Sequence, residues 1–407
     1  MKLLQINSTL NTTSTGRIAE EIGLRAIERG YESYAACYRL GDGGSSSNVL
    51  EIGSSIDRYL HGIKTRVFDR HGFGSIGATG ELVETIRKIN PDVIGLHNLH
   101  GYYLNIEVLF NYLKEAQKPV IWTFHDCWPF TGHCSYFDRF SCEKWKKECH
   151  DCPMTTYYPA SYGLDQSNRN FHDKKQLFTG LDNLTIVTPS HWLKGLVKES
   201  FLKEYPVEVI HNGIDLDVFK PGTDDLPEPV RKINEKMILG VASIWDDRKG
   251  LKDFLKLSEL IPDEYKIVLV GLDEKQLKQL PENILGMART ENVQQLASIY
   301  SAAEAFVNPT WSDNFPTTNI EALACGTPVI TYDTGGSPEA ADRNTGFVIK
   351  QGDLNGIVQS LKAISEMNRE SNIEMCRNRA VEHYNKEHRF RDYVELYSEM
   401  LGEKVVE

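Results

Sequence analysis

Short apolar runs alternate with amphipathic helical patterns along most of the chain. In the first half this pattern predicts strands at Leu3–Asn7, Ser33–Tyr38, Val93–His97, Val120–Phe124, Thr185–Thr188 and Glu208–Ile210. It predicts helices at Gly16–Arg29, Gly80–Ile89 and Ile106–Ala116. The alternation starts again with predicted strands at Met237–Ala242, Lys266–Gly271, Ala305–Asn308 and Pro328–Tyr332. Such alternation predicts an α/β protein with parallel sheets, and two series in one chain predict two Rossmann-like halves.

The length of the chain supports the same division. At 407 residues, the chain exceeds a typical domain, and two domains of about 200 residues each are expected. The junction between the two series is expected at Asn212–Pro221, followed by the polar loop Gly222–Pro229. We therefore predict an N-terminal domain of residues 1–211 with a cysteine-rich insertion at 127–153, a C-terminal domain of residues 212–388, and a final helical segment at 389–407.

The segment at 311–328 carries the most specific chemical signal. Asp313 precedes Glu321 by eight positions, and a helix can begin between them. Free backbone N–H groups at a helix start suit a phosphate, and here they belong to Thr317, Thr318 and Asn319. Glu321, one turn inside the helix, suits a ribose diol, because a carboxylate accepts two hydroxyl hydrogen bonds. The pattern therefore predicts a nucleotide-sugar site.

This segment resembles the acid-x7-acid motif of retaining glycosyltransferases of the GT-B fold, family 4. Members usually carry Glu first and then Gly-Phe, whereas this chain has Asp313-Asn314-Phe315-Pro316. That variant is similar to the branch that builds bacterial capsule and exopolysaccharide. The resemblance implies two Rossmann-like domains whose parallel sheets face each other across a cleft, with Phe315 in the donor site. It also implies that the last helix, near Arg389–Leu401, packs back on the first domain.

A second loop with charges suited to a phosphate opens the C-terminal domain. Arg248 and Lys249 follow a predicted strand and precede Gly250, and a planar fork beside a point charge suits a diphosphate. Lys249 matches the lysine of the resembled family, whereas the family's arginine position holds Ala242-Ser243. We expect Arg248 to compensate. The plain alternative is a solvated surface loop.

In the N-terminal domain, the loop that ends in Gly16 and Arg17 follows the first strand. A small, glycine-containing turn lets a ligand approach the backbone closely. In the resembled family this loop faces the phosphates of the donor. A strand-to-helix turn without a ligand explains the same residues equally well.

Histidines follow two predicted strands of the N-terminal domain, at the strand ends where α/β folds bind ligands. His125 resembles the family histidine that contacts the donor sugar near the reacting carbon, and we expect Asp126 to orient it. His97, Asn98 and His100 follow the previous strand, where we expect them to line the acceptor side. A structural histidine held by a neighbour is the alternative for His125.

Four cysteines form a separate cluster. The spacing Cys149-x-x-Cys152 is typical of a zinc half-site, and Cys134 and Cys142 complete a set that suits a tetrahedral structural Zn²⁺. His133 and His150 are substitute ligands, an iron–sulfur cluster is a second option, and four free thiols are the plain alternative. We expect the ion to shape the loop after His125.

Composition limits the partners. The net charge of −12 argues against nucleic-acid binding, and no apolar run reaches the ~20 residues that span a bilayer. The first residues resemble a strand rather than a signal peptide, so we expect a cytoplasmic protein. The segment Ile56–Phe73 is basic and amphipathic, which fits peripheral contact with the inner face of the membrane or an ordinary surface helix. Its basic residues are Arg58, His61, Lys64, Arg66, Arg70 and His71.

The expected reaction is transfer of a sugar from a UDP- or GDP-linked donor to a lipid-linked or oligosaccharide acceptor. The chain has no Asp-x-Asp motif at a strand end, so we expect no catalytic metal, and cations and helix N-termini would stabilise the leaving diphosphate. With no second acid placed as a nucleophile, attack on the same face assisted by the leaving phosphate is preferred. Two alternatives stay open: a sugar-nucleotide epimerase on the same fold, and a non-catalytic zinc-containing binding protein.

Overall fold

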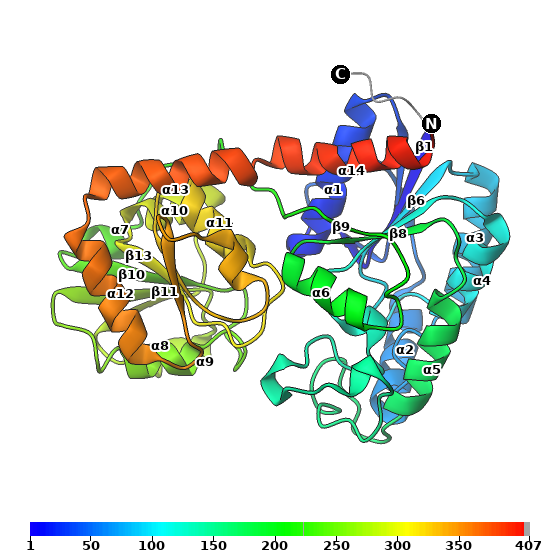
Figure 1. Ribbon diagram of the computed structural model, residues 1–407, viewed down its shortest axis with the longest axis horizontal. Helices are drawn as coiled ribbons and strands as arrows, with labels where there is room; N and C mark the ends of the chain where they lie inside the picture. The colour runs from blue at the N-terminus through cyan, green and yellow to red at the C-terminus, as the bar shows by residue number, and fades with distance from the viewer. Residues whose placement is uncertain (223, 403–407) are drawn as a thin grey trace. The chain divides into compact units, whose positions relative to one another are not determined.

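The computed structural model describes residues 1–222 and 224–402 (Figure 1). The chain divides into two compact units. The first contains residues Met1–Ile210 together with the C-terminal segment that begins at Glu387, and the second contains His211–Lys386.

The first unit is built on a parallel sheet with the strand order β5-β3-β1-β6-β7-β8-β9. Its strands are β1 (Lys2–Ile6), β3 (Glu32–Cys37), β5 (Asn48–Glu51), β6 (Val93–Leu96), β7 (Val120–Thr123), β8 (Leu184–Thr188) and β9 (Val207–Val209). A two-stranded sheet pairs β2 (Thr9–Leu10) with β4 (Arg39–Leu40). The helices of this unit are α1 (Thr13–Glu28), α2 (Ser55–Phe68), α3 (Ile76–Ile89), α4 (Ile106–Ala116), α5 (Ser167–Phe178), α6 (His191–Glu199) and α14 (Lys386–Met400), which begins at the last residue of the second unit.

Neighbouring residues of these strands enter different cores. Leu3 lies in a buried cluster with residues of α1 and α14, whereas Leu4 lies in the cluster that contains α3 and α4. Because side chains alternate across a strand, the sheet is covered on both faces, as an all-parallel sheet requires. The C-terminal helix α14 supplies Phe390, Tyr393 and Tyr397 to the first of these cores, so it packs on the first unit (Figure 1).

The second unit repeats the plan with the strand order β12-β11-β10-β13-β14-β15. The strands are β10 (Lys236–Val241), β11 (Tyr265–Val270), β12 (Ile284–Met287), β13 (Ala305–Asn308), β14 (Val329–Tyr332) and β15 (Gly346–Ile349). The helices are α7 (Glu228–Arg231), α8 (Leu251–Leu257), α9 (Glu274–Leu277), α10 (Val293–Ala302), α11 (Thr317–Ala324), α12 (Leu354–Glu366) and α13 (Arg369–His383). Leu239 packs with α10 and α11, and Ile238 packs with α8 and α12, so both faces are covered here too.

The parallel α/β architecture expected from the sequence is present in both units. The central strands lie within two residues of their predicted bounds, and α4 and β13 match the prediction. The pattern missed β5, β12 and β15, which are edge strands of the two sheets. Edge strands are short and partly exposed, so they lack the continuous apolar run that marks a central strand.

Several helices begin or end away from their predicted positions. Helix α3 begins at Ile76 rather than at Gly80, and α14 begins at Lys386 rather than at Arg389. The helix α1 begins at Thr13, so Gly16 lies inside its first turn rather than before it. The helix α2 ends at Phe68 and not at Phe73, because Asp69 adopts a left-handed conformation with φ of 50° that stops the helix.

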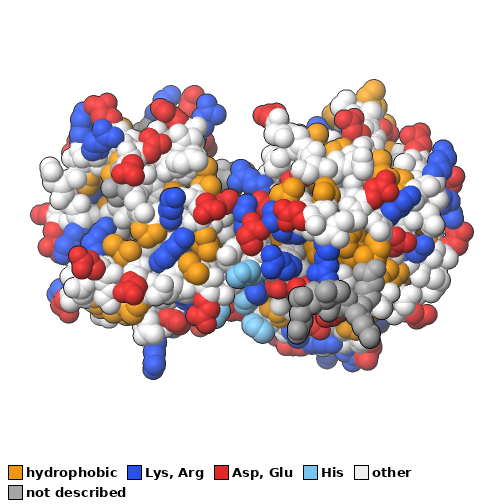
Figure 2. All heavy atoms as spheres, turned by 90° about the horizontal axis from the view of Figure 1, so that it is seen from above, with side chains coloured by type: hydrophobic (Ala, Val, Ile, Leu, Met, Phe, Trp, Pro, Cys, Tyr) orange, Lys and Arg blue, Asp and Glu red, His pale blue; other side chains and the backbone are white. Residues whose placement is uncertain are grey.

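Acidic and basic side chains are interspersed over the face shown in Figure 2. This mixture fits the net charge of −12 and differs from the one-sided basic surface of a nucleic-acid-binding protein.

Candidate functional site

In the second unit, the loops that follow β10 and β13 meet. The two strands are neighbours, and the strand order reverses between them, which is where open α/β sheets bind ligands. The backbone N–H of Trp311 donates to the carbonyl of Arg248 at 2.7 Å. Gly250 has a φ of 78°, and a Cβ there would lie 2.2 Å from the Pro309 carbonyl oxygen. Glycine at 250 is therefore what allows the two loops to touch.

This contact brings the two predicted cations to the predicted acid. Lys249 Nζ donates to Asp313 Oδ2 at 2.5 Å, and Arg248 Nη1 lies 3.6 Å from the same oxygen. Burial alone would raise the pKa of Asp313, but the charges of Lys249 and Arg248 outweigh it and lower that pKa. Asp313 is therefore a carboxylate at neutral pH. Arg248 Nε also lies 3.9 Å from Asp246 Oδ2, so two carboxylates face the two cations.

Helix α11 begins one residue after Pro316, as the motif predicted. Thr317 and Thr318 occupy its first two positions, whose backbone N–H groups have no acceptor within a helix. Asn319 differs from the prediction, because its N–H donates to the carbonyl of Pro316 at 3.1 Å. Its buried side chain joins Asn308 at 2.7 Å and Ser337 at 3.0 Å. Asn319 thus holds the helix start in place, and the interpretation that its N–H meets a phosphate is wrong.

Glu321 lies on the next turn and is half-buried. Its Oε2 accepts a hydrogen bond from the Tyr300 hydroxyl at 2.9 Å, which orients the carboxylate.

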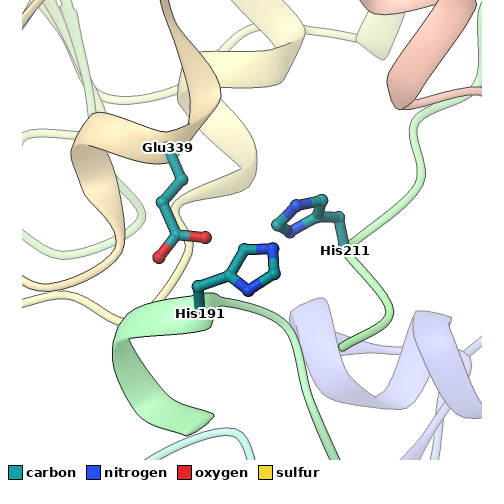
Figure 3. A group of neighbouring side chains, drawn as sticks. All are labelled: His191, His211 and Glu339. Atoms are coloured by element: carbon teal, nitrogen blue, oxygen red, sulfur yellow. The ribbon is translucent and has the colours of Figure 1, made fainter. Parts of the chain in front are cut away.

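Phe315 is buried, and its ring stacks on the imidazole of His211 with the ring centroids 4.8 Å apart. Candidate ligand atoms of His211 and Glu339, both in the second unit, lie within 4.8 Å of each other (Figure 3). The figure also draws His191, the first residue of α6 in the first unit. Glu339 carried no motif signal in the sequence.

In the first unit, the loop before α1 is tightly built. Asn11 and Thr13 have positive φ angles of 49° and 57°. Gly16 is buried, and a Cβ at this position would lie 2.7 Å from Thr9 Oγ1. Arg17, the next residue, is exposed.

A chain of hydrogen bonds fixes the predicted catalytic histidine. Gln5 Nε2 donates to the Ala19 carbonyl at 2.8 Å, so its Oε1 must accept from His97 Nε2 at 3.1 Å. Burial, with a smaller effect of His125, lowers the pKa of His97 well below its usual value, so this ring is neutral. Its unprotonated Nδ1 then accepts from His125 Nε2 at 3.2 Å.

His125 is neutral for the same reason. Burial lowers its pKa to about 4, although the charge of Asp126 acts in the opposite direction. With its proton on Nε2, the ring presents an unprotonated Nδ1. Nδ1 of His125 can therefore accept a hydrogen bond but cannot donate one.

Asp126 does not have the partner that the sequence suggested. Its Oδ2 lies 2.8 Å from His100 Nε2, and its Oδ1 accepts from the Trp128 N–H at 2.9 Å. The Tyr158 hydroxyl bonds the other nitrogen of His100 at 2.9 Å. Asp126 thus orients His100, and the prediction that it orients its neighbour His125 is wrong. The remaining residue of that predicted group, Asn98, accepts the Tyr103 hydroxyl on its backbone carbonyl.

Two histidines counted as basic residues on the surface are instead buried beside this cluster. Burial lowers the pKa of His61 to about 4 and that of His71 well below its usual value. His71 Nε2 accepts the Gly101 N–H at 3.3 Å, and its ring packs 4.7 Å from the ring of Tyr102. The pattern of apolar and polar residues in this segment did not predict that the two histidines are buried.

The predicted metal ligands lie in the long connection from β7 to α5. Cys134, Cys142, Cys149 and Cys152 all line one cavity of about 20 Å³. The four are free thiols.

Comparison with known proteins defines the class. The chain shares the GT-B fold with solved structures of low sequence identity. Sucrose-phosphate synthase of Thermosynechococcus elongatus aligns with a TM-score of 0.71 and 16% identity over 98% of this chain and 99% of that chain. Anabaena Alr3699/HepE, solved in complex with UDP-glucose, aligns with a TM-score of 0.66 and 14% identity over 98% and 100%.

Family models cover both units. A model for "Glycosyltransferase Family 4" matches residues 15–218, and one for "Glycosyl transferases group 1" matches residues 235–366. The chain belongs to glycosyltransferase family 4, a retaining family, and is a nucleotide-sugar glycosyltransferase. This assignment favours transfer over the epimerase and over the non-catalytic binding protein.

Relatives in polysaccharide biosynthesis match over much of the chain. WcaC of Escherichia coli (strain K12), provisionally named a colanic acid biosynthesis glycosyl transferase, is 27% identical over 89% of this chain and 90% of its own length. CapM of Staphylococcus aureus, a capsular polysaccharide biosynthesis glycosyltransferase, is 25% identical over 47% and 54%.

The neutral state of His125 predicts how stability depends on pH. Unfolded, this histidine takes up a proton below about pH 6.5, whereas folded it does so only near pH 4, so stability present above pH 6.5 is lost as the pH falls. We expect His125→Asn to reduce the loss of unfolding free energy between pH 7 and pH 5 by about 2 kcal/mol. Urea unfolding at both pH values measures this difference.

The exposed His388 provides the control, and His388→Asn should keep the wild-type pH dependence. An unchanged pH dependence in His125→Asn would show that His125 is protonated equally in both states.

Proposed function

We propose that this enzyme transfers a sugar from a UDP-linked donor to a lipid-linked glycan acceptor at an anionic membrane face, in surface polysaccharide biosynthesis. The observation that carries the proposal is the cluster of Lys249, Arg248 and Asp313 at the point where the strand order of the second sheet reverses. The UDP complex of the Anabaena structure and the polysaccharide relatives support the choice of donor and pathway class.

The second unit supplies the donor site. Lys249 and Arg248 bind the diphosphate, and Asp313 holds both cations in position before the donor arrives. The first N–H groups of α11, at Thr317 and Thr318, face the same phosphates through the positive end of the helix dipole. Glu321, oriented by Tyr300, accepts the hydroxyls of the ribose.

The first unit supplies groups for the sugar and the acceptor. His125 accepts a hydroxyl hydrogen bond of the donor sugar at Nδ1, because Gln5 and His97 fix its tautomer. The pair of His100 and Asp126 serves the acceptor side. The loop at Gly16 and Arg17 contributes to the phosphates of the donor.

The preferred chemistry keeps the anomeric configuration. The bond from the anomeric carbon to the diphosphate breaks while the acceptor hydroxyl attacks the same face. The proton of that hydroxyl passes to the departing phosphate oxygen. Cations held ready before the reaction stabilise the charge that develops on the diphosphate. No metal ion is required in this scheme.

Helix α2 supports contact with a membrane, because it buries polar and small residues and exposes apolar ones. The positions that it buries are His61, Gly62 and Thr65. Phe68, at its end, is an exposed apolar residue. Five further exposed apolar residues follow helical spacing along one stripe, and they are Ile56, Tyr59, Leu60, Ile63 and Val67. An exposed stripe of this kind in a surface helix indicates an interaction site.

The surroundings of the stripe favour an anionic lipid surface as its partner. Arg58 and Arg66 are exposed on the same helix. The adjoining loop adds two exposed apolar side chains, Tyr162 and Leu164, and the Tyr162 N–H donates to the carbonyl of Arg66 at 2.8 Å. Apolar and basic groups together bind anionic lipid. Among the described helices none is long and apolar enough to cross a bilayer, so contact would be peripheral.

A substitution of Glu321 tests the proposed donor site. We expect Glu321→Gln to weaken UDP-sugar binding by about 10²-fold, because charge-assisted hydrogen bonds to the ribose are lost while the shape is kept. Titration calorimetry with the best donor from a thermal-shift panel of UDP- and GDP-sugars measures the change. Glu304→Gln, an acid paired with Arg369, is the matched control and should bind as the wild type does. Equal affinities in the two variants would refute the ribose assignment.

A substitution of Lys249 tests whether this lysine stabilises the leaving diphosphate. We expect Lys249→Met to slow transfer by about 10²–10³-fold, because a preorganised charge at the leaving group is removed. Lys252→Met removes an exposed lysine of the next helix and should transfer at the wild-type rate. Single-turnover transfer separates this effect from donor binding. A wild-type rate in Lys249→Met would refute the role of Lys249 at the diphosphate.

Substitutions in helix α2 test the proposed contact with a membrane. We expect Leu60→Ser with Ile63→Ser to weaken binding to anionic vesicles by about 10²-fold, because two apolar side chains no longer enter the lipid. Flotation with phosphatidylglycerol and phosphatidylcholine vesicles measures the partition. Leu260→Ser, at an exposed apolar position of the second unit, should bind like the wild type. Binding that is equal for all variants would show that α2 is an ordinary surface helix.

A further inference from the structure

The cysteine-rich connection between β7 and α5 contains groups that the transfer reaction does not use. The thiols of Cys134, Cys142, Cys149 and Cys152 line the same cavity of about 20 Å³. A volume of this size holds a single water molecule or ion. One of the thiols already accepts a backbone hydrogen bond, from the Gly132 N–H to Cys149 Sγ at 3.2 Å. Such N–H bonds to sulfur are of the kind that stabilise a thiolate.

A buried histidine faces this cavity with a nitrogen that has no partner among the described residues. His133 lines the cavity and is 2% exposed. Its Nδ1 lies 2.6 Å from Asp69 Oδ1, whereas its Nε2 has no hydrogen-bond partner. A carboxylate bonded to one nitrogen of a histidine is an arrangement found around metal sites.

Two more unpartnered groups belong to the wall of the same cavity. Trp145 Nε1 and Ser167 Oγ are buried without a hydrogen-bond partner in the described structure. Buried polar atoms are satisfied in the great majority of cases, so several exceptions around one void indicate that the void receives a ligand.

A buried lysine lies beside the loop. Lys174 is 1% exposed, and its Nζ donates to the carbonyls of Trp128 and Thr131 at 2.8 and 3.0 Å. It also lies 3.5 Å from the centre of the Trp128 ring. None of these described contacts is an anion. The carboxylates of Asp126 and Asp69 also interact with it electrostatically, and thiolates around a divalent ion would add further negative charge.

We propose that this cavity is a structural zinc site in which the thiolates of Cys134, Cys142, Cys149 and Cys152 bind one Zn²⁺. His133, fixed by Asp69, and Lys174 stand next to this tetrathiolate centre as its polar and positive surroundings. No three of the four described thiols lie within 4.8 Å of one another, so binding draws them together around the ion. A closed set of four thiolates is the usual form of a structural zinc site.

The location of the cavity indicates what a bound ion would stabilise. The cysteine loop begins directly after His125 and Asp126, and the Cys127 N–H donates to the carbonyl of Ser135 at 2.9 Å. Farther along the same connection, Tyr158 bonds His100. Zinc would therefore hold the segment that positions the His100–Asp126 pair, and it would leave the donor site of the second unit unaffected.

Metal analysis of the full chain tests the site. Protein purified without a metal-affinity tag from zinc-supplied cells should contain about one zinc per chain by mass spectrometry. Cys142→Ser and Cys149→Ser should each lower this to less than about a tenth, because a tetrahedral site loses a ligand. Cys376→Ser, a buried cysteine of the second unit, is the matched control and should keep the full content.

Chelation of the wild-type protein gives a second readout that does not depend on variant folding. Removal of zinc should increase hydrogen exchange over residues 127–166, and added zinc should restore protection. UDP-sugar affinity of the second unit should stay the same throughout.

Several results would overturn the proposal. Wild-type zinc below about a tenth of an equivalent, with all four thiols titrating in the native protein, would leave a cysteine-rich loop without a metal. Iron with acid-labile sulfide, or a native disulfide between two of the four, would replace zinc by another chemistry. Zinc that is retained in Cys142→Ser and lost in His133→Asn would replace the tetrathiolate set by three thiolates and an imidazole.

Discussion

The hydrogen bond between Lys249 and Asp313 depends on how closely two loops approach, and much of the second unit serves that approach. Parallel strands bring the loops after β10 and β13 to one edge of the sheet. Gly250 lets the backbones touch, and a Cβ at Gly335 would lie 1.8 Å from the Asp313 carbonyl oxygen, so a third loop closes in with the same requirement. The acid and the cations therefore occupy fixed positions without any ligand, which is the preorganisation that stabilises a leaving group.

The first unit fixes its polar groups by a different physical route. Here burial keeps the histidines neutral, and a fixed amide then decides which nitrogen of each ring carries the proton. Gln5 lies two strands away from His125 in the sheet, yet it determines that His125 accepts rather than donates at Nδ1. One unit thus works through charges held in place, and the other through hydrogen-bond direction.

The sequence predicted the parallel α/β architecture and the central strands, because buried strands and amphipathic helices leave strong periodic signals. It also brought Lys249, Arg248 and the start of α11 to one region, since loops at strand ends of one sheet gather at one edge. The sequence did not predict the correct hydrogen-bond partner where a side chain has two candidate partners nearby. Asp126 is adjacent to His125 along the chain but bonds His100, and only the twist and register of β6 and β7 decide this. The edge strands and the inward face of α2 were hidden for a related reason, because partial burial leaves no clear period.

Asp69 joins two parts of the first unit that the chain keeps far apart. Its left-handed backbone ends α2, and its side chain accepts from the backbone N–H of Gln166 at 2.8 Å and pairs with His133. Asn170 on α5 donates to its carbonyl oxygen at 2.6 Å. The residue therefore acts as a mechanical joint between the surface helix and the cysteine loop. A substitution of Asp69 would therefore disturb the end of α2 and the cysteine loop together.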